Sequence, residues 1–484
     1  MTLIKKWLLI FRMRVFRYIA CLLLIIPLVS GCGRDGLSSN TSFIYPPLAS
    51  HWGFARLGVF DLRLLLGNKT RFDNPQGITI FTPKGGSPVS FWVNSGQNVI
   101  VYNRSRFSLN SHGLRTPHSL QIYGKNLTGE GRLRIPWGIA VDGVGNVYVV
   151  DRGNSRLVKF RYSTETTTAG ELLFEGQIGG EGSEPGQFLD PRGVSVAGEG
   201  LIAVVDNSLD RVTIMNDKGE VLNYWDGLDE PVSIAASYQA GSKLPDSGKS
   251  PDFLIVIDSL DRRVTKCDYN GNVLARVDAM KWNAPLTPEL NFVAIDGHQQ
   301  TYITDRNNGC IHKLDKDLNY LTRFGESGTG DYQFDQPRGI AIDPQSGQMF
   351  VVEREQLQRL LVAVDVPLFT ADVSTDSVLR NLLIDFKITE PAYVDFDLVD
   401  DHGQFVARIL QDMRYSAGLH HVSWGLVIPT ELPDGRPSPT LPPPYKPGEK
   451  LPNGEYRIKA TFTATYESKN PFANEKVTDF VLKW

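Results

Sequence analysis

Aspartates recur at the ends of short aliphatic runs, and they are the first residues that could carry acid–base or metal chemistry. They are Asp151, Asp206, Asp258 and Asp305. In three copies an arginine follows five residues later, giving the pairs Asp151/Arg156, Asp206/Arg211 and Asp258/Arg263. A strand-end aspartate can accept hydrogen bonds from backbone amides two residues further on. Because the pattern recurs, we interpret these seven residues as structural turns and predict an ion pair in each of the three copies.

The histidines and cysteines do not form a catalytic pattern. His112, His118, His298 and His312 lie outside the recurring motif, and there is no His-x-His, His-Glu-x-x-His or Gly-x-Ser-x-Gly sequence. We therefore expect no metal, no cofactor and no catalytic residue, with His298 and His312 on the surface. Cys267 and Cys310 occupy different positions in neighbouring copies, which favours two buried thiols, with a disulfide as the alternative.

The N-terminus has the features of a targeting segment. Residues 1–17 carry five basic residues and no acid, and the apolar run 18–29 is shorter than the roughly 20 residues of a typical membrane span. Val29-Ser30-Gly31-Cys32 resembles the bacterial lipobox. The resemblance implies a signal peptide over residues 1–31, a lipid on Cys32 and a tether over residues 32–56. We expect a cell-envelope protein on a membrane, the outer one where the cell has two, since Gly33 is not the aspartate associated with inner-membrane retention.

Composition excludes several classes of protein. Lys plus Arg is 50 and Asp plus Glu is 54, so the net charge is −4 and no global basic field marks a nucleic-acid binder. Four cysteines exclude a disulfide framework. The length of 484 residues allows two to four domains at about 100–200 residues each.

The elements that must position the aspartates come from a repeat. Six stretches start with a Pro-x-Gly-aliphatic pattern, complete or degenerate, and continue with a second β-rich run; they begin at residues 75, 136, 191, 231, 290 and 337. Copy four lacks the glycine, and copy five lacks both proline and glycine. Short aliphatic runs bounded by Gly, Asn and Asp are typical of strands. Small sheets of this kind bury their faces by packing radially, so we predict an all-β, six-bladed β-propeller.

The repeat resembles the NHL family. The sequences that carry the resemblance are PWGIAVD (136–142), VVDRGNSR (149–156), GQFLDPRGV (186–194) and YQFDQPRGI (332–340). The resemblance implies an NHL-type propeller over residues 57–366. It also implies that a terminal segment such as 57–65 closes the ring as a strand.

One face of the predicted ring collects arginines and a tryptophan. These residues occupy the variable position of Pro-x-Gly or follow the strand-end acid; we call this set the rim: Trp137, Arg152, Arg192, Arg306, Arg338 and Arg354. Arg and Trp are enriched in binding hot spots. The rim is therefore a candidate binding site, while the alternative is that its arginines only pair with acids of neighbouring blades.

A second domain follows the repeat. Residues 378–410, 417–424 and 451–462 have strand patterns, and the region 375–484 resembles the immunoglobulin-like domain of flagellar hook-cap (FlgD) proteins. The residues that carry the resemblance are Asp401, Gly403, Gly418-Leu419-His420, Trp424 and Asn453-Gly454-Tyr456. The family's Trp-Asp-Gly is Trp424-Gly425 here, followed by a Pro-rich insertion at 429–450. We predict an Ig-like β-sandwich.

Three functions fit these features. The first is a membrane-anchored, non-catalytic scaffold whose rim binds a protein, peptide or glycan partner. The second is a lyase or lactonase-like hydrolase with a metal in the central channel, and the third is a structural subunit of an envelope complex. Inward-facing carboxylates or histidines at the channel would favour the enzyme, whereas an Arg and aromatic rim favours the scaffold.

Overall fold

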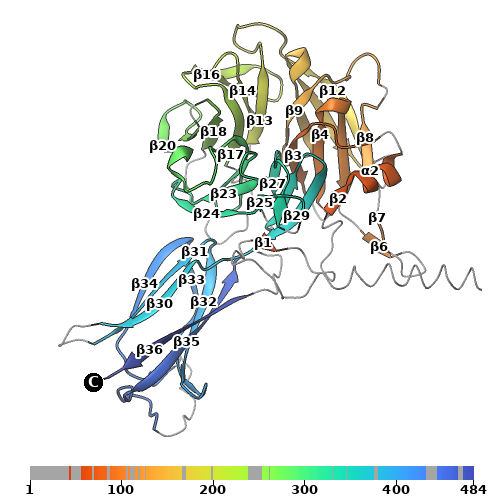
Figure 1. Ribbon diagram of the computed structural model, residues 1–484. Helices are drawn as coiled ribbons and strands as arrows, with labels where there is room; N and C mark the ends of the chain where they lie inside the picture. Colours follow the sequence, from red (N-terminus) through yellow and green to blue (C-terminus); the bar gives the residue numbers. More distant parts are fainter. Residues whose placement is uncertain are drawn as a thin grey trace, which may run out of the picture.

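The computed structural model describes residues 43–44, 56–67, 70–83, 88–104, 107–109, 115–117, 120–125, 127–165, 170–197, 200–237, 253–260, 262–330, 332–344, 346–374, 380–431, 444–466 and 473–483. Within them the chain is almost entirely β and forms a six-bladed propeller followed by a β-sandwich (Figure 1). Cys32, the predicted signal segment 1–31, His112, His118 and most of the insertion 429–450 lie outside the described residues. Among the described residues, no helix is both long and apolar enough to cross a membrane.

Five blades are four-stranded antiparallel sheets, built from consecutive strands except in blade 1, where β6 and β7 come between its third and fourth strands. Blade 1 contains β3 (Pro75–Phe81), β4 (Val89–Asn94), β5 (Val99–Arg104) and β8 (Leu120–Tyr123). Blade 2 contains β9 (Pro136–Val141), β10 (Asn146–Asp151), β11 (Arg156–Ser163) and β12 (Glu171–Ile178). Blade 3 contains β13 (Pro191–Ala197), β14 (Leu201–Asp206), β15 (Arg211–Met215) and β16 (Val221–Asp226). Blade 4 contains β17 (Pro231–Ala236), β18 (Leu254–Asp258), β19 (Arg263–Cys267) and β20 (Val273–Asp278). Blade 5 contains β21 (Leu290–Ile295), β22 (Thr301–Asp305), β23 (Cys310–Leu314) and β24 (Tyr320–Phe324).

Blade 6 is completed by the N-terminal part of the chain. Its strands β27 (Ile340–Ile342), β28 (Gln348–Val352) and β29 (Gln356–Val362) pair in order. Both β1 (Phe43–Ile44) and β2 (Arg56–Gly58) pair antiparallel with β29 at its outer edge. The expectation of a closing strand at 57–65 is thus correct only at its start, because Val59–Leu66 is the helix α2. Part of the predicted tether 32–56 also belongs to this sheet.

Short elements lie in the connections between strands, within a blade or between neighbouring blades. They are the hairpin β6 (Phe107–Leu109) and β7 (Arg115–Pro117), the parallel pair β25 (Glu326–Ser327) and β26 (Gln333–Phe334), and the 3-10 turns η4 (Ser95–Gln97), η5 (Arg152–Asn154) and η6 (Ala279–Lys281).

The glycine of Pro-x-Gly is required by close packing between blades. A Cβ on Gly193 would lie 2.8 Å from both the amide nitrogen of Ile234 and the Cα of Ser233 in the next blade. Blade 4 has Ser233 instead of glycine, and its hydroxyl accepts a hydrogen bond from Val293 N of blade 5 at 3.2 Å. A side-chain hydrogen bond therefore replaces close backbone packing where the repeat departs from its pattern.

The C-terminal domain is a sandwich of two antiparallel sheets. One sheet contains β30 (Leu368–Val373), β31 (Leu382–Ile388) and β34 (Gly418–Trp424). The other contains β33 (Phe405–Tyr415), β32 (Ala392–Asp400), β35 (Gly454–Ala464) and β36 (Asn474–Leu482). Because β30 pairs with β31, the sandwich begins before the predicted boundary at residue 375. The pattern of β30 follows the last repeat without a break, which hid this boundary in the sequence.

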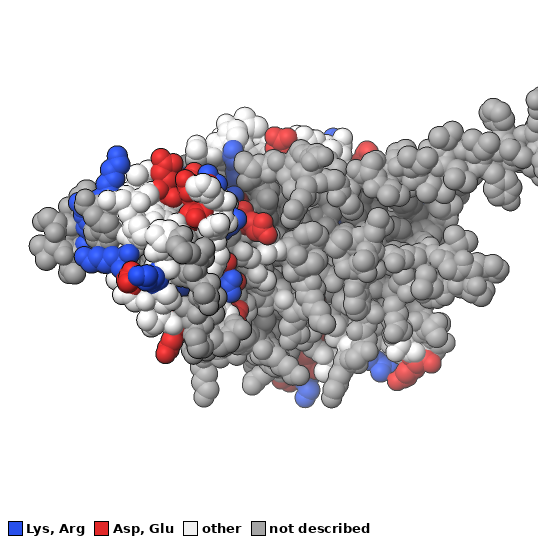
Figure 2. Space-filling model, turned by 90° about the horizontal axis from the view of Figure 1, so that it is seen from below, with Lys and Arg blue, Asp and Glu red and all other residues white. Residues whose placement is uncertain are grey.

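The two domains share one hydrophobic core. Buried residues of blades 5 and 6, such as Phe324 and Leu360, belong to the same cluster as Phe386 and Phe462 of the sandwich. A polar contact crosses the same joint, where the Tyr466 hydroxyl donates to Asp296 Oδ2 at 2.8 Å. Seen from below, the described surface carries lysines and arginines beside aspartates and glutamates rather than a field of one sign (Figure 2).

Candidate functional site

The strand-end acids tie down the loop that enters each blade. Asp151 Oδ1 accepts from the amide of Arg134 at 2.6 Å, and Asp206 Oδ2 accepts from the amide of Leu189 at 2.8 Å. Backbone amides in the loops before blades 1, 5 and 6 donate equivalent hydrogen bonds to the strand-end residues of those blades. The acceptors are Asn94 Oδ1, Asp305 Oδ1 and Glu353 Oε2. These carboxylates and the amide are buried. Their lone pairs are thus directed at backbone of the same blade.

The predicted aspartate–arginine pairs form in one blade and not in another. Arg156 Nε lies 2.8 Å from Asp151 Oδ2. Arg211 does not reach Asp206; its Nε lies 2.7 Å from Asp226 Oδ1. The reason is register, because Asp226 is directly opposite Arg211 on the neighbouring strand. The prediction for this pair is wrong.

Blade 4 gives a third arrangement. Arg263 Nη2 lies 2.7 Å from Asp229 Oδ2 in the loop before the blade. Asp258 is buried, its Oδ1 has no hydrogen-bond partner, and burial raises the pKa of this carboxyl from 3.8 to about 6. Nearby Arg263 opposes that rise.

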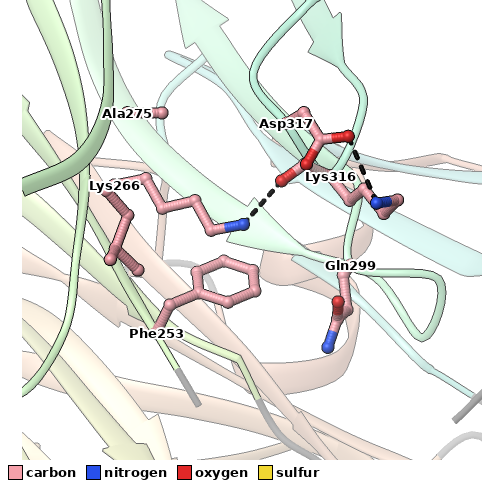
Figure 3. A pocket seen from close by; sticks show the side chains of 7 residues that line it. Phe253, Lys266, Ala275, Gln299, Lys316 and Asp317 are labelled. Carbon is pink, nitrogen blue, oxygen red and sulfur yellow. Dashed lines mark hydrogen bonds and ion pairs between the residues drawn. The ribbon is translucent and has the colours of Figure 1, made fainter. Parts of the chain in front are cut away.

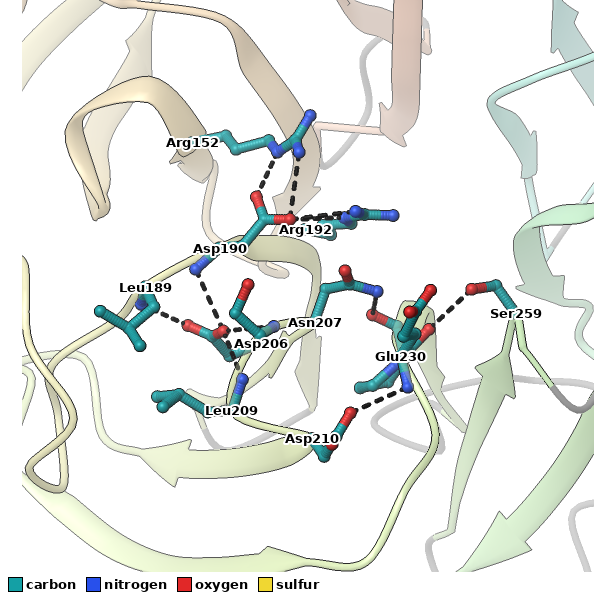
Figure 4. A network of polar contacts seen from close by, with 12 residues as sticks. Arg152, Leu189, Asp190, Arg192, Asp206, Asn207, Leu209, Asp210, Glu230 and Ser259 are labelled. Carbon is teal, nitrogen blue, oxygen red and sulfur yellow. Dashed lines mark hydrogen bonds and ion pairs between the residues drawn. The ribbon is translucent and has the colours of Figure 1, made fainter.

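Trp137, Arg152 and Arg192 of the rim come together around Asp190. The guanidinium of Arg152 binds both oxygens of Asp190, with Nη2 at 3.0 Å from Oδ2, and Arg192 Nη2 lies 3.0 Å from the same oxygen (Figure 4). The two guanidinium carbons lie 4.8 Å and 5.7 Å from the ring centre of Trp137. Although burial alone would raise the pKa of Asp190, its two arginines lower it. This cluster joins blade 2 to blade 3.

Trp137 reaches the axis of the ring. Its indole packs against the core cluster of blades 2 and 3 and also against the cluster that contains blades 5 and 6. Blades 5 and 6 lie across the ring from blades 2 and 3, so a side chain that packs against both clusters lies on the inner side of the ring. The indole Nε1 is buried and has no hydrogen-bond partner.

The other rim arginines also bind groups of the chain. Arg306 Nη1 lies 2.8 Å from Glu289 Oε1, and Arg354 Nη2 lies 2.7 Å from Asp335 Oδ2. Arg338 is only 7% exposed, and its Nη1 donates to the Pro75 carbonyl oxygen at 3.0 Å as well as to the Asn74 side chain. Burial lowers the pKa of Arg338 to about 10. It therefore holds blade 6 against blade 1, and the interpretation of the rim as an open surface does not extend to it.

Four buried polar atoms on rim residues or on the variable position of Pro-x-Gly have no partner in the described part of the chain. They are Gln76 Oε1, Trp137 Nε1, Arg306 Nε and Arg338 Nε. Gln76, Trp137 and Arg338 all occupy the variable position of Pro-x-Gly in their blades. Buried polar groups in native proteins are almost always bonded to protein or to ordered water, so each of these atoms needs an ordered water molecule or a ligand as its partner. The sequence pattern identifies the position but not the unpaired atoms.

Two histidines expected on the surface are buried or partly buried. His312 is fully buried, with its Nε2 3.0 Å from Asp305 Oδ2. His298 lies in the joint between the domains, with its Nε2 3.0 Å from the hydroxyl of Thr465. Both expectations are wrong. The sandwich covers His298, and the aromatic side chain of Trp282 covers His312. Cys267 and Cys310 are free and buried, as expected.

A pocket of about 360 Å³ lies between blades 4 and 5 and is separate from the rim (Figure 3). It is lined by Phe253, Lys266, Leu274, Ala275, Gln299, Lys316 and Asp317. The ammonium of Lys266 lies 3.9 Å from the ring centre of Phe253 and donates to the carbonyl oxygen of Lys316 at 2.7 Å. Burial lowers the pKa of Lys266. This ammonium is bound within the chain, as are the rim arginines. The rim remains the candidate site because the buried N–H of Trp137 has no partner there.

The NHL repeat family matches residues 133–160, which cover β9, β10 and most of β11. An NHL repeat therefore lies in blade 2. No curated protein matches the sequence of the chain.

Several solved structures are similar in fold. A streptogramin B lyase is 12% identical, with a TM-score of 0.38, and the match covers 60% of this chain and 94% of the lyase chain. A virginiamycin B lyase from Staphylococcus aureus is 11% identical with a TM-score of 0.40, covering 63% and 98%. A gluconolactonase from Xanthomonas campestris is 13% identical with a TM-score of 0.41, covering 66% and 95%.

Proposed function

We propose that the chain is a lipid-anchored, non-catalytic binding scaffold of the bacterial cell envelope. The propeller presents the rim to a protein, peptide or glycan partner. The observation that supports this function is Trp137, whose indole lies beside Arg152 and Arg192 on the inner side of the ring and has a buried N–H without a partner. Tryptophan and arginine are the residues most enriched in binding hot spots.

The chemistry of the rim favours a partner rich in oxygen acceptors. Three of the four unpaired atoms are N–H donors, on Trp137, Arg306 and Arg338. Carboxylates, amide carbonyls and sugar hydroxyls can accept such bonds, and the flat face of an indole can stack against a sugar ring or a peptide side chain. A peptide or glycan segment placed over the axis would meet both kinds of contact.

The arrangement of the ligating residues favours the scaffold over the hydrolase. In the part of the chain that the structure describes, two groups of three side chains could hold a metal: Asp305/Cys310/His312 and Asp400/Asp401/His402. The first is inside blade 5 and the second is on a hairpin of the sandwich, so neither surrounds the axis where a substrate of the propeller would sit.

Substitution of Trp137 tests the binding proposal. Trp137→Phe keeps a ring and removes the N–H, so we expect weaker capture of the partner, and Trp137→Ala should abolish it. Arg457→Ala, an exposed position on the sandwich paired with Asp479, is the matched control. Pull-downs from envelope extract, with a thermal melt of each variant, provide the measurement. Equal capture by wild type and Trp137→Ala would overturn the proposal.

The lipid anchor has a separate test. Cys32→Ala should leave the precursor unprocessed or release the chain from membranes, because the thiol is the acceptor of the lipid. Membrane fractionation and intact mass provide the readout. A Cys32→Ala chain that is processed and fractionates like wild type would overturn the anchor without affecting the binding proposal.

A further inference from the structure

Three ligand-type side chains converge inside blade 5. The Sγ of Cys310 lies 3.8 Å from Nε2 of His312, and the same nitrogen lies 3.0 Å from Oδ2 of Asp305. All three residues are buried. Cys310 and His312 are two residues apart on β23, so their side chains leave the strand on the same face.

The other blades show that this cluster is a departure from the repeat. The positions five and seven residues after the strand-end residue hold Val99 and Val101, Arg156 and Val158, Arg211 and Thr213, Arg263 and Thr265, and Gln358 and Leu360. Blade 5 alone has a thiol and an imidazole there. Two simultaneous changes to metal-ligating types, both facing the strand-end aspartate, are not needed to make a blade.

The distances fit a small tetrahedral ion. With Zn–S near 2.3 Å and Zn–N or Zn–O near 2.1 Å, tetrahedral angles place S and N about 3.6 Å apart and N and O about 3.4 Å apart. The observed separations of 3.8 Å and 3.0 Å are within about 0.4 Å of these values. The sulfur and the carboxylate oxygen lie within 4.8 Å of each other, against about 3.6 Å in such a site, so the side chains on β23 would move closer to Asp305 on binding.

The surroundings of the histidine are those of a metal ligand. Its Nδ1 lies 3.2 Å from the hydroxyl of Tyr320, and Trp282 covers the ring with centres 4.6 Å apart. A metal-bound histidine normally uses its second nitrogen in a hydrogen bond that fixes the ring. The geometry is not that of a nucleophile triad, because one nitrogen of His312 faces both the sulfur and the carboxylate and cannot relay a proton between them.

We propose that Asp305, Cys310 and His312 bind one Zn²⁺ ion as a structural centre of blade 5. Binding replaces the proton of the Cys310 thiol, which leaves to solvent, with a Zn–S bond. The hydrogen bond between Asp305 and His312 accounts for the positions of these two side chains. It does not account for the sulfur of Cys310, which lies beside the same nitrogen of His312. The proposal departs from the expectation of no metal, which rested on the absence of a sequence motif.

Because the cluster is buried, the metal must enter as the chain folds. The purified full chain is therefore unfolded with chelator and refolded with Co²⁺ alone, which reports thiolate ligation by a charge-transfer band in the near ultraviolet. We expect one Co²⁺ per chain with this band in wild type and in Cys267→Ser, the control at the other buried cysteine. Cys310→Ser and His312→Gln should lose the band and the bound metal.

Zn²⁺ provides a second readout. Refolding with Zn²⁺ should raise the melting temperature of wild type and Cys267→Ser by several degrees relative to refolding with chelator, and should not change that of Cys310→Ser. Folded wild type with less than about one tenth of a metal ion per chain and no band would overturn the proposal. A band that persists in Cys310→Ser would overturn it as well. If one variant fails to refold, the wild-type stoichiometry and the other variant still decide.

Discussion

Removal of the Glu390 carboxylate should loosen the joint between propeller and sandwich. Glu390 Oε1 receives the Tyr302 hydroxyl at 2.7 Å and also the ammonium of Lys313, and all three residues are fully buried. Burial lowers the pKa of Lys313 to about 7, so the ammonium is predominantly charged at pH 6. Breaking a buried pair by removing one member typically costs about 3–5 kcal/mol, because the remaining charge has no counterion.

The expected loss is measurable by calorimetry. For a chain of 484 residues, about 3–5 kcal/mol corresponds to a fall in Tm of roughly 3–5 °C in Glu390→Ala at pH 6. Since blades 5 and 6 share one core with the sandwich, we expect wild type to melt in a single transition. In Glu390→Ala the sandwich should melt first, as a separate transition.

Two variants separate charge from packing. Glu390→Gln keeps an acceptor for Tyr302 and should lose less than Glu390→Ala. The double variant Lys313→Met/Glu390→Met removes both charges and fills the space, so it should recover most of the stability. A wild-type midpoint in Glu390→Ala would refute the reasoning, and so would a double variant less stable than Glu390→Ala.

Three further predictions concern the propeller. Asp151→Ala removes the acceptor of the Arg134 amide and should lower the free energy of unfolding by about 1–3 kcal/mol, measured by urea denaturation, whereas no loss would mean that Asp151 is not a turn residue. Gly193→Ala should cost about 1–3 kcal/mol because its Cβ would lie 2.8 Å from backbone, while Gly180→Ala, with no atom within 4 Å, should be neutral or stabilising; equal effects would contradict the packing argument. Burial raises the pKa of the Asp258 carboxyl from 3.8 to about 6, so between these pH values the folded chain holds a proton that the unfolded chain releases. The stability that this proton contributes to the folded chain is therefore fully present below pH 3.8 and is lost as the pH rises through 6. Between pH 4 and 6 the stability of Asp258→Asn should therefore rise relative to wild type, and parallel pH profiles would refute this.

The propeller was predictable from sequence because each blade is specified locally. The run PWGIAVD predicts a strand that the structure places at Pro136–Val141, and the following VYVVD falls within Asn146–Asp151. Alternation, turn residues and glycine act within a few residues of each other, so a single copy contains most of the information for its blade. The same is true of the hairpin at Asp400–Gly403, which joins β32 and β33.

The partners of the charged side chains were not predictable in the same way. Arg211 pairs with Asp226 because β15 and β16 place them opposite each other, and the count of residues to Asp206 contains no such information. Lys313 and Glu390 are 77 residues apart and belong to different domains. A lysine in a strand reads as a solvent-facing residue until the surface that covers it is known.

Blade 5 is the loosest copy of the repeat, and the structure accounts for several of its departures. In place of the glycine it has Phe292, and Thr304 instead bridges to the backbone of blade 6 with its hydroxyl at 2.8 Å from a carbonyl oxygen. Lys313 faces the sandwich, which removes the need for a polar outer surface. Cys310 and His312 replace the arginine and the small β-branched side chain that blades 2 to 4 hold at the same positions. A copy that only had to close the ring would retain the pattern, since the pattern suffices in blades 2 and 3. Weak agreement with a repeat can therefore identify the blade that has acquired a contact with another domain and a ligand cluster of its own.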